Sequence, residues 1–130
     1  NFLFLDIKKT NPVLWEPIGF NNALKKIEND FVQIGKIIKD NNLELYILTY
    51  PWPDTLEYGQ NSFNWEKFSN SLCIKSECSN LINLFPDFQK IKNNNNNWLY
   101  KIYIDGDLHI THFGHKIIAD KIINKVFLNE

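Results

Sequence analysis

The chain of 130 residues contains no arginine and no methionine, and it has only two cysteines. All 14 basic residues are therefore lysine, and they nearly balance 15 acidic residues. Without arginine, the chain lacks the planar, forked donor that binds phosphate or guanine through two hydrogen bonds, and no basic stripe replaces it. We therefore expect no nucleic-acid partner.

Long hydrophobic runs are also missing. No apolar stretch approaches the roughly 20 residues that cross a bilayer, so we expect no transmembrane segment in this chain. The opening apolar segment 1–5 is too short for a signal peptide, because Asp6 interrupts it. Since the sequence also lacks an initiator methionine, we expect the chain to be part of a longer polypeptide.

The apolar residues that are present follow the pattern of one α/β domain. Their spacing of three and four predicts a helix over residues 24–38, which Asn21 or Asn22 would cap and Asn41-Asn42 would end. The remaining apolar segments predict strands over 43–50 and 81–85, helices over 64–71 and 111–127, and an element of either type over 98–104. This order predicts parallel strands with helices packed over them. Thr111 is the natural N-cap of the last helix.

All three histidines, His109, His112 and His115, fall within seven residues, beside Asp105 and Asp107. The cluster lies between an apolar segment and the start of the last predicted helix. Open α/β sheets collect functional groups in such loops, outside the carboxyl ends of their strands. We therefore place the candidate chemistry here.

Three interpretations of the cluster stay open on the residues alone. In the first, Asp107 and His109 point to the same side of an extended loop, because they are two residues apart. The carboxylate would then fix the imidazole tautomer and leave the other ring nitrogen as a general base. In the second, Asp107 and the three histidines bind zinc. In the third, Asp105 or Asp107 binds backbone N–H groups and the histidines only lie near the surface.

The segment from Asp107 to Ala119, DLHITHFGHKIIA, resembles the last sequence block of the SGNH (GDSL-like) hydrolases. In that block an Asp and a His, two or three apart, precede a Gly-His or Gly-Asn step and a helix beginning Ile-Ala. Segments 50–53 (YPWP) and 81–88 (LINLFPDF) are also similar to bacterial members that act on acyl groups of the cell envelope or of polysaccharides. The similarity covers roughly residues 13–127, in order.

The resemblance implies a flavodoxin-like three-layer α/β/α fold and acyl-ester chemistry without a cofactor or a metal. A serine attacks the ester, a histidine acts as the base, and an aspartate orients the histidine. The resemblance identifies Asp107 as the orienting residue and His109 as the base. Asp105 is the rival for the first role and His112 for the second, whereas His115 is expected to pack at the helix start.

The nucleophile of that family sits in a Gly-Asp-Ser motif, which this sequence lacks, since Leu108 follows Gly106-Asp107. The resemblance therefore implies that residues 1–130 are the C-terminal portion of a single SGNH domain, without its nucleophile-bearing part. The segment Gly19-Phe20-Asn21-Asn22 is similar to the Gly-x-Asn oxyanion block of the family. We expect it instead to cap the first helix, because no strand precedes it there.

The expected function is therefore that of a serine esterase or acyltransferase acting on acyl, in particular O-acetyl, esters of small molecules or glycans. The alternative is a non-catalytic module that keeps the fold and binds carbohydrate. Trp52, held between two prolines, is the candidate substrate-binding residue. Cys73 and Cys78 form no Cys-x-x-Cys motif. A disulfide between them would favour a periplasmic or cell-envelope location, and two reduced thiols are the alternative.

Overall fold

Two short parallel strands lie at the centre of the molecule. The computed structural model describes residues 19–107 and 109–128. Strand β1 (Tyr46–Thr49) pairs with β2 (Asn80–Asn83), and the connection between them contains helices α2 (Pro53–Tyr58) and α3 (Trp65–Lys75). The two predicted strands and their parallel pairing are confirmed, but both strands are shorter than predicted. Of the residues in β1, only Ile47 is fully buried.

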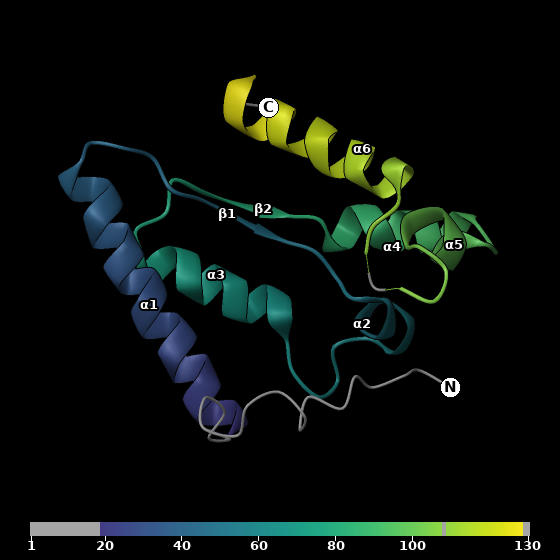
Figure 1. The fold of residues 1–130 in the computed structure, drawn as a ribbon, viewed down its shortest axis with the longest axis horizontal. Coiled ribbons are helices and arrows are strands. Elements are labelled where there is room, and N and C mark those ends of the chain that lie inside the picture. The colour runs from purple at the N-terminus through teal and green to yellow at the C-terminus, as the bar shows by residue number, and fades with distance from the viewer. Residues whose placement is uncertain (1–18, 108, 129–130) are drawn as a thin grey trace.

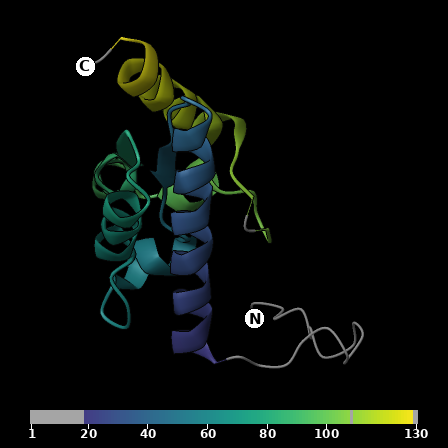
Figure 2. The same cartoon turned by 90° about the vertical axis from the view of Figure 1, so that its left-hand side faces the viewer.

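Helices enclose the strand pair. They are α1 (Phe20–Asp40), α4 (Phe85–Asn94), α5 (Trp98–Ile102) and α6 (His112–Ile122), which continues as a π-helical turn (Ile123–Phe127). Figure 1 shows α3 on one side of the strands and α6 on the other. Figure 2, which is turned by 90°, shows the long helix α1 beside α3, and the two helices are in contact. The described residues therefore form a mixed α/β structure that is mostly helical around a two-stranded parallel sheet.

Glycine and a disulfide bring the ends of α1 and α3 together. A Cβ atom on Gly35 would lie only 2.1 Å from the carbonyl oxygen of Ser76, so only glycine allows this approach. The turn after α3 is closed by a disulfide between Cys73 and Cys78. The disulfide interpretation of the two cysteines is therefore confirmed.

The hydrophobic core lies where α2, α4, α5 and the start of α6 meet. Its buried members are Leu56, Leu84, Phe88, Ile102, Tyr103 and Ile110. Partly buried side chains from β1 and α6, including Leu48, Ile117 and Ile118, pack against this cluster. The core therefore joins the strand pair to the segment that carries the histidines.

The helix starts differ from the sequence-based prediction. Gly19, not Asn21 or Asn22, is the N-cap of α1, and both asparagines lie exposed within its first turn. Helices α2 and α4 were not predicted, and Pro53 and Pro86 stand in their first turns. The N–H groups of the first helical turn have no acceptor within the helix, so the N–H that proline lacks is not missed there. The proline ring also fixes φ close to the helical value.

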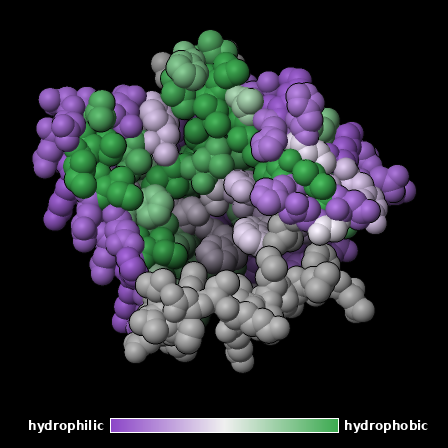
Figure 3. All heavy atoms as spheres, in the orientation of Figure 1, coloured by the Kyte–Doolittle hydropathy of each residue, from purple (hydrophilic) through white to green (hydrophobic). Residues whose placement is uncertain are grey.

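Hydrophobic side chains gather on the face shown in Figure 3, in a band that runs from α6 across the strands towards α1. The elements bordering this face carry exposed large apolar residues, among them Ile37 (61%), Leu43 (62%) and Phe127 (72%). Continuous apolar surface of this kind commonly marks an interaction site. No described helix combines the length and apolarity that crossing a membrane requires.

Candidate functional site

The candidate site is built on a loop whose base is fixed by backbone pairing. Tyr103 and Ile110 form an antiparallel bridge. Next to it, the Ile104 N–H donates to the His109 carbonyl (2.9 Å) and the Thr111 N–H donates to the Ile102 carbonyl (2.8 Å). Because Ile102, Tyr103 and Ile110 are buried, the base belongs to the core, and the polar residues between them extend from it.

A tight turn gives the loop its shape. The Asp107 N–H donates to the Ile104 carbonyl (3.0 Å), and Gly106 adopts a φ of +69°. This left-handed conformation costs little only in glycine. Gly106 thus turns the chain and brings Asp107 back towards His109.

Asp107 and His109 are in direct contact. Asp107 Oδ1 lies 2.6 Å from His109 Nδ1 and also accepts the His109 backbone N–H at 3.1 Å. The His109 side chain is 82% exposed and that of Asp107 is 47% exposed. Since Nδ1 faces the carboxylate, Nε2 faces away from it. An imidazole oriented in this way can accept a proton at Nε2 while the carboxylate stabilises the resulting cation.

The other two histidines lie on α6. His112 is its first residue, and both His112 and His115 are exposed. Across the described ranges 19–107 and 109–128, no three or more His, Cys, Asp or Glu side chains are grouped so that they could hold a metal ion. Asp105 is exposed beside Asp107. Of the interpretations drawn from the sequence, the first has the contact between Asp107 Oδ1 and His109 Nδ1, and the third has the backbone N–H of His109 donating to Asp107 Oδ1.

Within the Gly-His step of the sequence block, Gly114 has a packing role, whereas His115, which was expected to pack at the helix start, is exposed. A Cβ atom on Gly114 would lie 2.3 Å from Ile110 Cγ2 and 2.9 Å from the Ile102 carbonyl oxygen. Thr111 caps α6 as predicted, because its Oγ1 accepts the Gly114 N–H (3.2 Å) while donating to the Lys101 carbonyl (2.6 Å). The first turn of α6 therefore packs directly against the base of the loop.

A buried tyrosine links the loop base to the segment that leaves β1. The Tyr103 hydroxyl donates to the Pro51 carbonyl at 2.6 Å. Burial, with a smaller contribution from nearby Tyr50, raises the pKa of the Tyr103 hydroxyl well above its ordinary value. Sequence reasoning missed this contact, because Tyr103 reads only as one apolar position in an aromatic segment. It holds the loop beside the carboxyl end of β1, where functional groups are expected in an α/β sheet.

Two of the predicted site residues, Asp107 and Trp52, line different cavities near α2. Asp107 and Pro53 line a cavity of about 360 Å³. Trp52, whose side chain is 59% exposed, lines a separate cavity of about 230 Å³ with Tyr50 and Trp65. The structure thus brings Asp107 and His109 together and places Trp52 in a neighbouring hollow.

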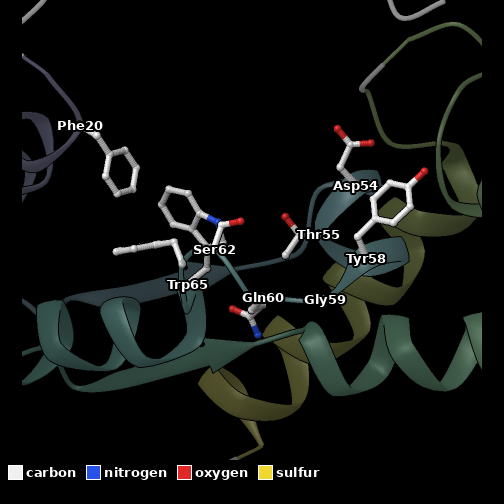
Figure 4. Close-up of a pocket in the computed structure, with 9 residues that line it drawn as sticks. Phe20, Asp54, Thr55, Tyr58, Gly59, Gln60, Ser62 and Trp65 are labelled. Carbon is white, nitrogen blue, oxygen red and sulfur yellow. The ribbon is translucent and has the colours of Figure 1, made fainter.

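A still larger cavity, of about 570 Å³, contains none of the predicted site residues among the described residues that line it. Figure 4 shows Phe20 and Trp65 on one side of it and Asp54, Thr55 and Tyr58 of α2 on the other. Its walls carry no histidine and no oriented base, so we keep the candidate site at Asp107 and His109.

The candidate site therefore consists of the exposed His109 imidazole, oriented by Asp107, which lines the adjoining cavity. It can remove a proton from a hydroxyl group, but the sequence has no Gly-Asp-Ser motif to supply that hydroxyl. The chain matches no family model, no curated protein and no solved structure.

Proposed function

We propose that this chain is the C-terminal part of an SGNH-type serine esterase or acyltransferase that acts on acyl, in particular O-acetyl, esters of small molecules or glycans. The observation that carries the proposal is the 2.6 Å contact between Asp107 Oδ1 and His109 Nδ1. This contact occurs within the very segment whose sequence resembles the last block of that family.

In the proposed mechanism, a serine from the missing part of the domain attacks the ester carbonyl. His109 Nε2 accepts the serine proton, and Asp107 stabilises the imidazolium that forms. The proton then passes to the leaving alkoxide, which departs as an alcohol and leaves an acyl-serine. Water completes a hydrolysis, whereas a second alcohol completes a transfer, with His109 again accepting the proton of the attacking group.

The shape of the described residues supports the proposal of an incomplete domain. A flavodoxin-like fold has helices on both faces of a parallel sheet, and α3 and α6 lie on opposite sides of the strand pair (Figure 1). The apolar band between α6 and α1 (Figure 3) is where further strands and helices of such a fold would pack. The Cys73–Cys78 disulfide supports a location outside the cytoplasm.

Ester turnover by the complete reading frame and by the 130-residue chain tests this function. We expect the complete protein to hydrolyse a chromogenic acetyl ester and the chain alone to be inactive, since it lacks the attacking serine. Activity of the chain alone that His109→Ala abolishes would place the nucleophile within these residues. A complete reading frame without a serine block would contradict the enzyme proposal.

The second candidate function is carbohydrate binding without catalysis. The observation that favours it is the exposure of Trp52 (59%), Trp65 (37%) and Tyr50 (40%) around one cavity at the end of β1. In that case Trp52→Ala should abolish glycan binding, and the complete protein should have no esterase activity whatever residue stands at position 109.

A further inference from the structure

Two cavities beside the candidate site share part of their walls. The first contains Asp107 and measures about 360 Å³, and the second measures about 350 Å³. They share three lining residues, Pro53, Leu99 and Tyr100. The two cavities therefore adjoin each other at Pro53 and α5, and together they are called the groove below.

The walls of the groove carry both aromatic rings and hydrogen-bonding groups. Tyr100 (60% exposed) lines both cavities, and Tyr58 (76% exposed) lines the second. The amides of Asn96 and Asn97 line the second cavity, and the carboxylate of Asp105 lines the first. A pyranose ring matches such a wall, because its C–H faces are apolar and stack on aromatic rings while its hydroxyls need polar partners.

The charges along the groove favour a neutral ligand. The described lining residues include acidic side chains, Asp54, Asp105 and Asp107 among them, and no lysine. Lys92 is held by the carboxylate of the lining residue Glu57 (2.8 Å) and by the Leu56 carbonyl (2.9 Å). A polyanionic chain would meet like charge from these carboxylates, which opposes its binding. An alkyl chain would leave the amides and carboxylates without partners on desolvation.

We propose that this groove binds the neutral glycan part of the ester, with the acylated sugar at the Asp107 end and the adjoining sugar against Tyr100 and Asn96-Asn97. This inference rests on the proposed esterase function for the orientation of the glycan, but the binding surface belongs entirely to the present chain. It gives the proposed enzyme a substrate class, namely acylated neutral polysaccharides, and excludes uronic-acid polymers and lipid esters.

Titration of the 130-residue chain with chitohexaose, xylohexaose and hexagalacturonate tests the groove by calorimetry and by ¹⁵N chemical-shift mapping. We expect at least one neutral hexasaccharide to bind with a Kd of about 1 mM or tighter, with shifts at residues 96–100 and 105–107. Tyr100→Ala should weaken that binding at least about tenfold, which is a modest loss for one stacked ring. Phe127→Ala, which removes an aromatic ring that is also exposed (72%) from the C-terminal turn, should leave it unchanged. Circular dichroism checks that both variants fold.

The outcomes separate this inference from the proposed function. Neutral glycan binding that depends on Tyr100 supports the groove even if the complete protein proves to lack esterase activity. Equal or tighter binding of hexagalacturonate, no binding of either neutral hexasaccharide, or loss of binding in Trp52→Ala but not in Tyr100→Ala would overturn it, even if the complete protein is an esterase.

Discussion

His109 and Ile110 are neighbours in the chain, yet one side chain is 82% exposed and the other residue is only 7% exposed. This boundary divides the region into two parts, the loop of residues 104–109 and the loop base formed by Ile102, Tyr103, Ile110 and Gly114. The described loop residues, 104–107 and 109, are exposed to solvent, whereas the base is apolar and closely packed. The orientation of the Asp107–His109 pair therefore depends on the packing of the loop base as well as on the contact between the two side chains.

The first prediction concerns the loop, in the complete protein. Asp107→Asn should cut kcat by about 10⁴-fold, because an amide favours the wrong His109 tautomer. His109→Ala should be at least as damaging, and the double variant should add little, because residues that act as one unit are not additive. Steady-state kinetics on an acetyl ester measures all three.

Two controls accompany that measurement. Asp105→Asn and His112→Ala should each cost less than about tenfold, or roughly 1.4 kcal/mol, since neither residue has a proton-transfer role. If His112→Ala silences the enzyme and His109→Ala does not, the base has been assigned three residues too early in the sequence.

The second prediction concerns the loop base. Gly114→Ala should lower the free energy of unfolding by about 1–3 kcal/mol, because the added methyl group overlaps Ile110 and the Ile102 carbonyl and forces them apart. Chemical denaturation measures the loss. His115→Ala, an exposed change in the same turn, should stay within about 0.5 kcal/mol of the unchanged chain. Equal stabilities of the two variants would show that the base tolerates a larger side chain.

The third prediction concerns the link between the base and the segment after β1. Tyr103→Phe should cost about 1–2 kcal/mol, because the buried Pro51 carbonyl loses its donor. Tyr100→Phe, at an exposed position, should cost almost nothing. A Tyr103→Phe variant as stable as Tyr100→Phe would mean that water replaces the lost hydroxyl.

The raised pKa of Tyr103 gives this contact a pH signature. The folded chain keeps the hydroxyl proton at a pH where the unfolded chain has lost it, so the stability from this group is fully present below about pH 10 and declines above it. The difference in stability between the unchanged chain and Tyr103→Phe should therefore shrink as the pH rises above 10. A constant difference would contradict the assignment.

The sequence predicted more of the fold than of the site geometry. Apolar periodicity and turn residues located α1, both strands and α6, because these segments follow the simple rules of helix and strand burial. Helices α2 and α4 were missed, since proline at a helix start and proline as a breaker look alike without knowledge of the following turn. The contact between Asp107 and His109 could be predicted, because the two residues are only two positions apart in the sequence. The contact between Tyr103 and Pro51 joins residues 52 positions apart, and no local pattern encodes it.

The central claim is that Asp107 holds His109 in the tautomer that leaves Nε2 free to act as a base. Long-range ¹H–¹⁵N correlation NMR of the ¹⁵N-labelled chain, recorded at alkaline pH, reads the protonation of both ring nitrogens directly. We predict that His109 carries its proton on Nδ1 and has an unprotonated Nε2, and that Asp107→Asn shifts the population to the opposite tautomer. A proton on Nε2 in the unchanged chain, or a tautomer that Asp107→Asn leaves as it was, would contradict the claim.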